Sequence, residues 1–107
     1  MQLFPLKLVT VVGESLIMED IAERGTELGA SGYTMSEVVG HGSRSARNVG
    51  DTSGAKTIKV EFVVAADVAA KILDDVSAEY FEHYAIIVWV SDVGVMRGEQ
   101  YTSKSGG

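Results

Sequence analysis

The apolar and polar positions of the first half of the chain predict a strand, a helix and a second strand. A β-branched apolar run predicts a strand over Lys7–Val12, and a second apolar run predicts a strand over Tyr33–Val39. Between them, apolar residues recur at helical spacing, at Ile17, Ile21 and Leu28. We expect Ser15 to cap this helix at its beginning and Gly29 to end it.

The second half of the chain repeats the same order. Alternating or continuous apolar runs predict strands over Thr57–Val64 and Ala85–Val90. The segment between them predicts a helix from a capping Asp67 to about Tyr80, with one core-facing stripe formed by Val68, Ile72 and Val76. Two βαβ units of similar length in one short chain are typical of the ferredoxin-like arrangement.

This repeat predicts an α+β domain in which two helices cover one face of a four-stranded antiparallel sheet. A small parallel α/β domain is the alternative, but four strands with only two helices favour the antiparallel sheet. In the third strand, Val60, Phe62 and Val64 share the parity that faces the helices. The last strand is apolar on both faces, so we expect self-association to cover the second face and to bury Trp89 in an oligomer.

Composition and charge restrict the classes of function. The 107 residues form one domain with a net charge of −6, which argues against general binding to nucleic acid or to anionic membranes. The chain has no cysteine, which excludes disulfides, thiolate metal sites and thiol catalysis. The N-terminal pattern predicts neither a signal peptide nor a membrane span, so we expect a cytoplasmic protein.

Candidate chemistry gathers in the segment Gly40–Lys56, which is far longer than an ordinary strand connection. Its glycines allow backbone amides to surround an anion, the Ser43 hydroxyl adds a donor, and Arg44 and Arg47 offer forked contacts to phosphate oxygens. A loop that is merely solvated is the alternative. Neither His41 nor His83 stands in a metal-ligand pattern, and no arrangement of nucleophile, base or paired carboxylates indicates catalysis.

Three stretches of the chain carry a family resemblance, namely "GASGYTMSEVVGHGSR", "IKVEFVVA" and "EYFEHYAIIVWVSDV". In order and spacing the chain resembles the PII signalling superfamily from Lys7 to Tyr101, and within it the PII-like regulators of bicarbonate uptake and carboxysomes. The resemblance implies a homotrimer with nucleotide sites between subunits. It also implies that residues 1–101 form the domain, that residues 40–56 form its flexible T-loop, and that residues 102–107 form a flexible tail.

The resemblance also implies ligands and contacts. PII-like members bind AMP, ADP or cyclic AMP, and the carboxysome-associated members respond to bicarbonate, so a bicarbonate transporter or a carboxysome-related protein is the implied partner. Tyr33 and Thr34 would contact the base or sugar, and Phe62 and Val63 would line the cleft. The loop and last strand would complete the nucleotide site with Gly40, His41, Gly42, Ser43, Arg44, Arg47, Ala85, Ile86 and Ile87. Arg97 would contact phosphate or bicarbonate.

Departures from the family pattern limit what carries over. Better-known PII proteins have two close arginines after the last strand, whereas this chain has only Arg97, which weakens an assignment to ATP. The loop has no tyrosine, so loop uridylylation does not carry over. Two other functions are open on the residues alone: a small ferredoxin-like phosphatase of the acylphosphatase kind, and a structural trimer that resembles the copper-tolerance proteins.

Overall fold

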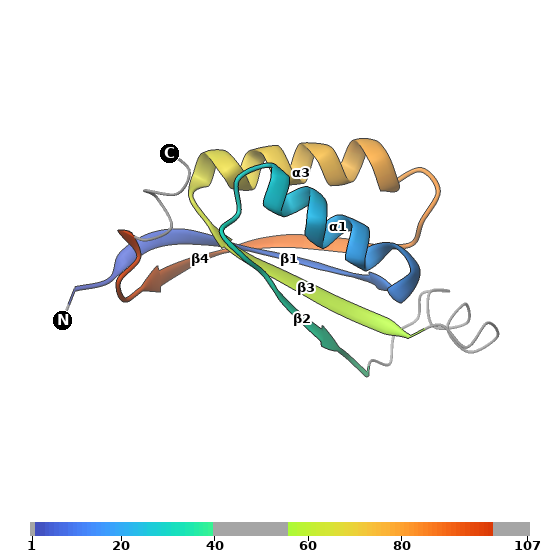
Figure 1. Ribbon diagram of the computed structural model, residues 1–107, viewed down its shortest axis with the longest axis horizontal. Helices are drawn as coiled ribbons and strands as arrows, with labels where there is room; N and C mark the ends of the chain where they lie inside the picture. The colour runs from blue at the N-terminus through green and yellow to red at the C-terminus, as the bar shows by residue number, and fades with distance from the viewer. Residues whose placement is uncertain (1, 40–55, 100–107) are drawn as a thin grey trace.

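The computed structural model describes residues 2–39 and 56–99, which form two helices and a four-stranded sheet. Along the chain the elements are β1 (Phe4–Glu14), α1 (Ser15–Glu27), β2 (Thr34–Glu37), β3 (Thr57–Val64), α3 (Ala66–Tyr80) and β4 (Ile87–Val95). The strand order is β2-β3-β1-β4, and every neighbouring pair is antiparallel. Both helices lie on one side of the sheet (Figure 1). The predicted ferredoxin-like arrangement is therefore confirmed.

The strands differ in length from the prediction because pairing with neighbours extends some of them. Strand β3 has the predicted bounds, whereas β1 begins at Phe4 and β4 runs from Ile87 to Val95. Strand β2 is shorter than predicted and covers only Thr34–Glu37. Phe4 is in register with Val95, so these two extensions hold each other in place. Pro5 is tolerated in β1 because pairing with β3 begins only at Lys7, so the missing N–H removes no bond on that side.

The two predicted helix caps are wrong, and the predicted helix stop is right. Ser15 is the first helical residue, and its N–H donates to the carbonyl oxygen of Lys56 at 2.8 Å; the N-cap is Glu14, without a side-chain bond. Asp67 lies within the first turn of α3, one residue past its start. Gly29 has φ +128° and ends α1 in a Schellman motif, in which the N–H of Ala30 donates to the Gly25 carbonyl oxygen at 3.0 Å.

The hydrophobic core fills the space between the sheet and the two helices. Phe62 of β3 is fully buried and lies beneath Gly25 of α1, where a Cβ atom would come within 2.3 Å of the Phe62 ring. The glycine thus lets the helix approach the sheet closely. The predicted stripe of α3 is buried, as are the helix-facing residues of β3. The described core consists of Val9, Val11, Ile17, Met18, Ile21, Ala22, Ala30, Val60, Phe62, Val64, Val68, Ala69, Ile72, Val76 and Tyr80.

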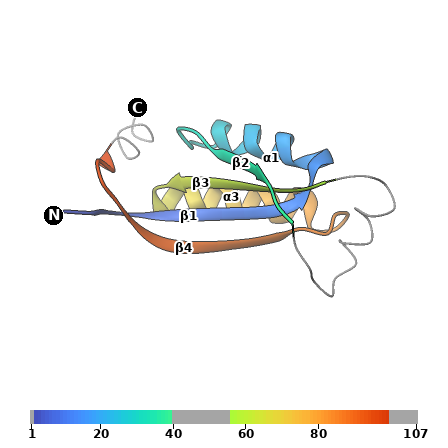
Figure 2. The ribbon, with the colours of Figure 1, turned by 90° about the horizontal axis from the view of Figure 1, so that it is seen from below.

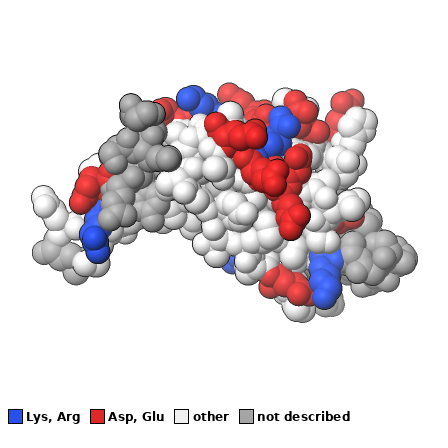
Figure 3. Space-filling view, in the orientation of Figure 1, with Lys and Arg blue, Asp and Glu red and all other residues white. Residues whose placement is uncertain are grey.

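Polar contacts join the two helices across their outer surface. The Arg24 guanidinium donates two hydrogen bonds of 2.7 Å to the carboxylate of Asp75, which holds the pKa of Asp75 below its ordinary value. The Tyr80 hydroxyl donates to Asp20, and burial together with this bond raises the pKa of Tyr80. Acidic side chains gather over the helices (Figure 3), so the helix layer is a poor surface for an anion.

The opposite face of the sheet carries no helix from residues 2–39 or 56–99. Seen from below in Figure 2, the strands lie in front of α3 with no described element on the near side. The strand register places Val12, Thr10 and Leu8 of β1 on this uncovered face, beside Ile87, Trp89 and Ser91 of β4. Ile87 is 55% exposed and Trp89 is 46% exposed. The apolar second face expected for β4 is therefore present, and its burial in an oligomer stays a prediction.

Candidate functional site

A pocket of about 370 Å³ opens on the uncovered face, near the edge formed by β2. Its wall begins at the turn after α1, continues along the start of β2, and crosses β3 to β1. The strand register explains why these segments meet, because Thr34 lies opposite Glu61 and Leu8 lies opposite Val63. The pocket is lined by Leu8, Ser31, Gly32, Tyr33, Thr34, Glu61 and Val63.

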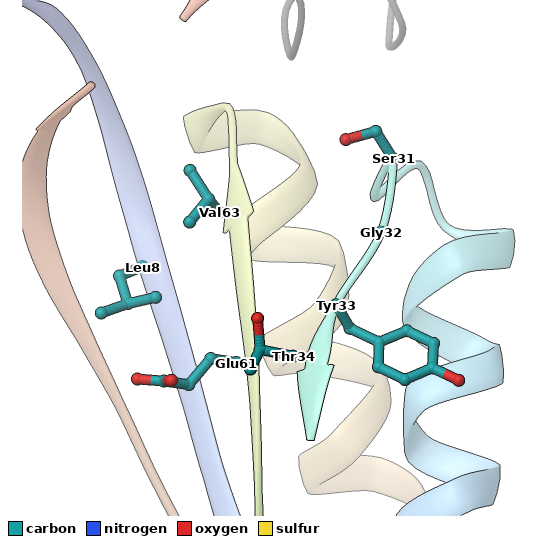
Figure 4. Close-up of a pocket in the computed structure, with 7 residues that line it drawn as sticks. All are labelled: Leu8, Ser31, Gly32, Tyr33, Thr34, Glu61 and Val63. Atoms are coloured by element: carbon teal, nitrogen blue, oxygen red, sulfur yellow. The ribbon is translucent and has the colours of Figure 1, made fainter. Parts of the chain in front are cut away.

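The pocket combines an apolar floor with a polar rim. Figure 4 shows Leu8 and Val63 on neighbouring strands. In the next cross-strand row Thr34 lies opposite Glu61, whose side chain extends toward β1 and away from Thr34. Ser31 adds a second hydroxyl at the end of the turn. Apolar walls with a few placed donors and acceptors suit a flat heterocycle and a sugar. None of the seven described lining residues is a cation, so phosphate groups need contacts from outside this set.

Of the residues predicted to contact the base or sugar or to line the cleft, three line this pocket and one is buried in the core. Thr34 and Val63 line the pocket, and their contact with a nucleotide stays a prediction. Tyr33 also lines it, but its ring points toward α1 in Figure 4 and packs edge-on against Phe62, with ring centroids 6.4 Å apart. Phe62, expected to line the cleft, has a fully buried side chain on the helix side of the sheet. Because side chains alternate along a strand, Phe62 supports β3 from behind while its neighbours face the pocket.

The contacts predicted in and around the last strand lie in two groups, at opposite ends of β4. Ala85 and Ile86 precede β4, and Ile86 packs against the core beside Gly13. Ile87 begins the strand, and Arg97 lies two residues beyond its end. Nine strand residues separate the two ends, which corresponds to roughly 30 Å. One small ligand cannot contact both ends of β4 in the same copy of the chain.

Arg97 is held in an unusual backbone conformation. Its φ is +60°, in the left-handed region that most side chains avoid, and its side chain is exposed. The next residue, Gly98, is buried so closely against Phe4 that a Cβ atom would lie 2.5 Å from it. The turn after β4 is thus fixed to the start of β1, and it presents Arg97 to solvent.

The loop residues expected to hold phosphate lie outside the described residues. These are Gly40, His41, Gly42, Ser43, Arg44 and Arg47, together with most of the expected T-loop and all of the expected tail. The structure does describe the base from which the segment leaves the sheet. There the Lys56 ammonium lies 3.6 Å from the Glu37 carboxylate, which joins the ends of β2 and β3.

Sequence reasoning missed four of the pocket residues: Leu8, Ser31, Gly32 and Glu61. The alternation of β3 carried a usable signal for Glu61, because it has the parity of Val63 and the opposite parity to Phe62. Leu8, Ser31 and Gly32 had no comparable signal, since they reach the pocket only through strand pairing and the turn after α1. Among residues 2–39 and 56–99, no cluster of histidine, aspartate and glutamate side chains could hold a metal ion.

The fold and pocket define a ferredoxin-like domain with a ligand-sized recess on its uncovered sheet face. The family model of nitrogen regulatory protein P-II matches residues 6–100. The chain therefore belongs to the P-II family, whose members are signalling proteins. In the part of the chain that the structure describes, neither helix has the length and apolar character needed to cross a bilayer.

Solved structures of related proteins agree with this assignment. The chain is 48% identical to a PII-like signalling protein from Thermus thermophilus, with a TM-score of 0.79, and 94% of this chain and 99% of that chain are covered. CPII from Thiomonas intermedia, solved with ADP, AMP and acetate, is 21% identical with a TM-score of 0.79, covering 94% and 98%. CutA from Synechococcus elongatus is 10% identical with a TM-score of 0.68, covering 98% and 94%. The last two likenesses show the fold alone.

Proposed function

We propose that this chain is a non-catalytic PII-like sensor that binds ADP or AMP in clefts between the copies of a homotrimer. The proposal rests on one observation: within one copy of the chain, the candidate contacts to the ligand are separated from one another. Among the described residues that line the pocket around Thr34 and Val63 there is no cation, and the two ends of β4 lie roughly 30 Å apart. A nucleotide can meet an apolar pocket and a cation together if neighbouring copies supply different parts of the site.

The pocket would hold the adenosine part of the ligand. Leu8 and Val63 offer an apolar surface to the base, while Thr34 and Glu61 offer hydrogen-bonding groups to the sugar or to the rim of the base. Arg44, Arg47 and Arg97 would bind the phosphates, with Gly42 and Ser43 adding donors from the loop. The CPII structure with ADP and AMP supports this choice of ligand by family relationship.

Bicarbonate is proposed as a second ligand, and a protein of inorganic carbon uptake or fixation as the partner. CPII from Thiomonas intermedia has been solved with ADP and bicarbonate together, which supports the pairing of these two ligands. The ligands would select among conformations of residues 40–56 and so change the fit to a bicarbonate transporter or a carboxysome-related protein. Such a shift can be no larger than the difference in ligand affinity between those conformations. We place this exchange in the cytoplasm.

The two other functions have weaker support. The likeness to CutA shows a shared fold and nothing of a shared function, since only 10% of the residues are identical. A phosphatase of the acylphosphatase kind needs a cation at the anion loop after the first strand, and residues 11–16, "VVGESL", offer none.

Thermal unfolding with added ligands tests the proposed function. A ligand that binds only the folded protein adds about 2.7 kcal/mol of stability at a concentration of 100 times its Kd. We therefore expect ADP and AMP to raise the Tm by several degrees, and bicarbonate to add to the shift with ADP. GDP is the matched control and should act weakly. Equal small shifts with every nucleotide, or none with any, would contradict the proposal, and steady release of phosphate from ADP would favour the phosphatase.

Replacing Arg97 by glycine separates its proposed role in binding from its effect on the fold. Glycine adopts a positive φ without strain, so we expect Arg97→Gly to keep or slightly raise the stability of the unliganded protein. Loss of a charge-assisted contact to phosphate should weaken ADP binding about tenfold or more. Calorimetric titration and thermal unfolding of the same sample measure both quantities. An unchanged Kd would remove Arg97 from the site.

A further inference from the structure

One wall of the pocket is a short stretch of backbone, residues 31–33, between α1 and the edge strand β2. Ser31 and Gly32 are exposed, and both line the pocket. The stretch follows Ala30, which is buried in the turn after α1. It ends at Tyr33, directly before β2. The place of this wall therefore depends on what holds the chain between Ala30 and β2.

Backbone hydrogen bonds between described residues do not hold residues 31–33. Outside the helices and strands, the backbone bonds among residues 2–39 and 56–99 include none that involves Ser31, Gly32 or Tyr33. A Cβ atom built on Gly32 meets no atom within 4 Å, so the space around it is open. Strand β2 has only four residues and, among the described strands, pairs with β3 alone. A side-chain contact is needed to fix the wall.

The Tyr33 side chain makes such a contact on the helix side of the sheet. Side chains alternate along an extended chain, so Tyr33 points to the face opposite Thr34. In Figure 4 its ring lies toward α1, away from the other labelled side chains of the pocket. The ring meets Phe62 with centroids 6.4 Å apart at an angle of 66°, which is the favourable edge-on geometry for two aromatic rings. Phe62 is itself held firmly, because it is fully buried beneath Gly25 of α1.

We propose that Tyr33 is a positioning residue of the pocket, whose ring anchors residues 31–33 against Phe62 without contacting the ligand. This role differs from the direct contact to base or sugar that the family resemblance implies for Tyr33. The inference rests on the proposed function, in which the pocket takes the adenosine part of a nucleotide. It follows that ligand binding depends on the aromatic ring of Tyr33 and not on its hydroxyl group.

Loss of the ring would act on binding through the order of the pocket wall. Without the anchor, residues 31–33 adopt more conformations, and only some of these leave the pocket in its binding shape. The apparent affinity falls in proportion to the fraction of molecules that are competent to bind. If about one molecule in ten keeps the wall in place, the Kd rises about tenfold. The disorder exists before any ligand is added, so it can be measured in the unliganded protein.

Removing the ring and removing only the hydroxyl test the proposal by calorimetric titration with ADP. We expect Tyr33→Ala to bind ADP at least about tenfold more weakly, and Tyr33→Phe to stay within about twofold of wild type. Phe81→Ala is the matched control, because it removes a ring of similar exposure, 54% against 48%, from a position that does not line the pocket. It should leave the Kd unchanged. An equal loss in Tyr33→Phe, or unchanged binding in Tyr33→Ala, would overturn the proposal.

Two further measurements separate an anchor from a ring that stacks on the ligand. In the unliganded protein, nuclear magnetic relaxation should give a lower order parameter for the Gly32 amide in Tyr33→Ala than in wild type or Tyr33→Phe. An unchanged order parameter would contradict the anchor. Tyr33→Ala combined with Phe62→Leu should bind ADP about as weakly as Tyr33→Ala alone, because both changes break the same contact. Losses that multiply would also contradict it.

The order parameter also separates this inference from the proposed function. A wild-type protein that binds no ADP would contradict the proposed function. The relaxation of Gly32 in the unliganded variants would still decide whether the Tyr33 ring holds the wall of the pocket.

Discussion

Replacing Phe62 by alanine should lower the free energy of unfolding by about 3–5 kcal/mol, a large share of the stability of a domain of this size. The ring is fully buried between β3 and α1, so its removal loses burial and leaves a cavity that the helix can close only in part. Urea unfolding followed by circular dichroism measures the change. Phe81→Ala removes the same side chain from a 54% exposed position and should cost less than about 0.5 kcal/mol.

The same contact can be tested from the helix side. In Gly25→Ala the new methyl group would approach the Phe62 ring to 2.3 Å, so we expect a cost of about 1–3 kcal/mol from overpacking. Combining Gly25→Ala with Phe62→Leu should cost less than the sum of the two single changes, because the smaller side chain makes room. A loss below about 1 kcal/mol in Phe62→Ala, accompanied by weaker nucleotide binding, would instead place Phe62 in the ligand cleft.

Replacing Gly32 by tryptophan should weaken ADP binding at least about 100-fold, which corresponds to about 2.7 kcal/mol. Gly32 lines the pocket, and a Cβ atom built on it has no neighbour within 4 Å. An indole at this position can therefore fill the pocket without disturbing the core. Calorimetric titration with ADP measures the loss.

Gly32→Ala is the matched control for the pocket. It makes the same change of backbone freedom but adds only one methyl group in open space, so both stability and Kd should stay close to wild type. An equal loss of binding in both variants would indicate a backbone effect. Tight binding in Gly32→Trp would show that the nucleotide lies elsewhere.

Strand β3 was predictable from sequence because its own side chains specify it. Alternation from Thr57 to Val64 gives both the bounds and the buried face, and Val60, Phe62 and Val64 lie where that parity puts them. The later part of β4 was not predictable in this way. Ser91, Asp92 and Gly94 are poor strand formers, and they become extended because β1 continues beside them.

The helix caps show how a tertiary contact can replace a local signal. A serine before an apolar helical pattern normally accepts a bond from the first turn. Here the N–H of Ser15 is bonded to the carbonyl oxygen of Lys56, so the chain before β3 fixes the beginning of α1. The end of α1 was predictable because only a positive φ allows this turn, and Gly29 is the residue that adopts it readily.

The candidate site was partly predictable. A residue could be predicted where the pattern of its own strand places it in the site, and not where its position depends on other strands. Thr34 and Val63 come from strands whose parity and neighbours the pattern specifies, and both line the pocket. The importance of Glu61 depends on strand register, since Thr34 and Thr10 flank it only when β2, β3 and β1 pair as they do. In the proposed function, contacts between copies bring together the pocket, Arg97 and the segment from Gly40 to Arg47. No pattern within one chain specifies such contacts.

A crystal structure of the protein grown with ADP is the most direct test of the proposed site. We predict a trimer in which the adenosine part of each ADP lies against Leu8, Thr34 and Val63 of one copy, while its phosphates contact arginine side chains. A monomer, or ADP bound away from this pocket at full occupancy, would contradict the account.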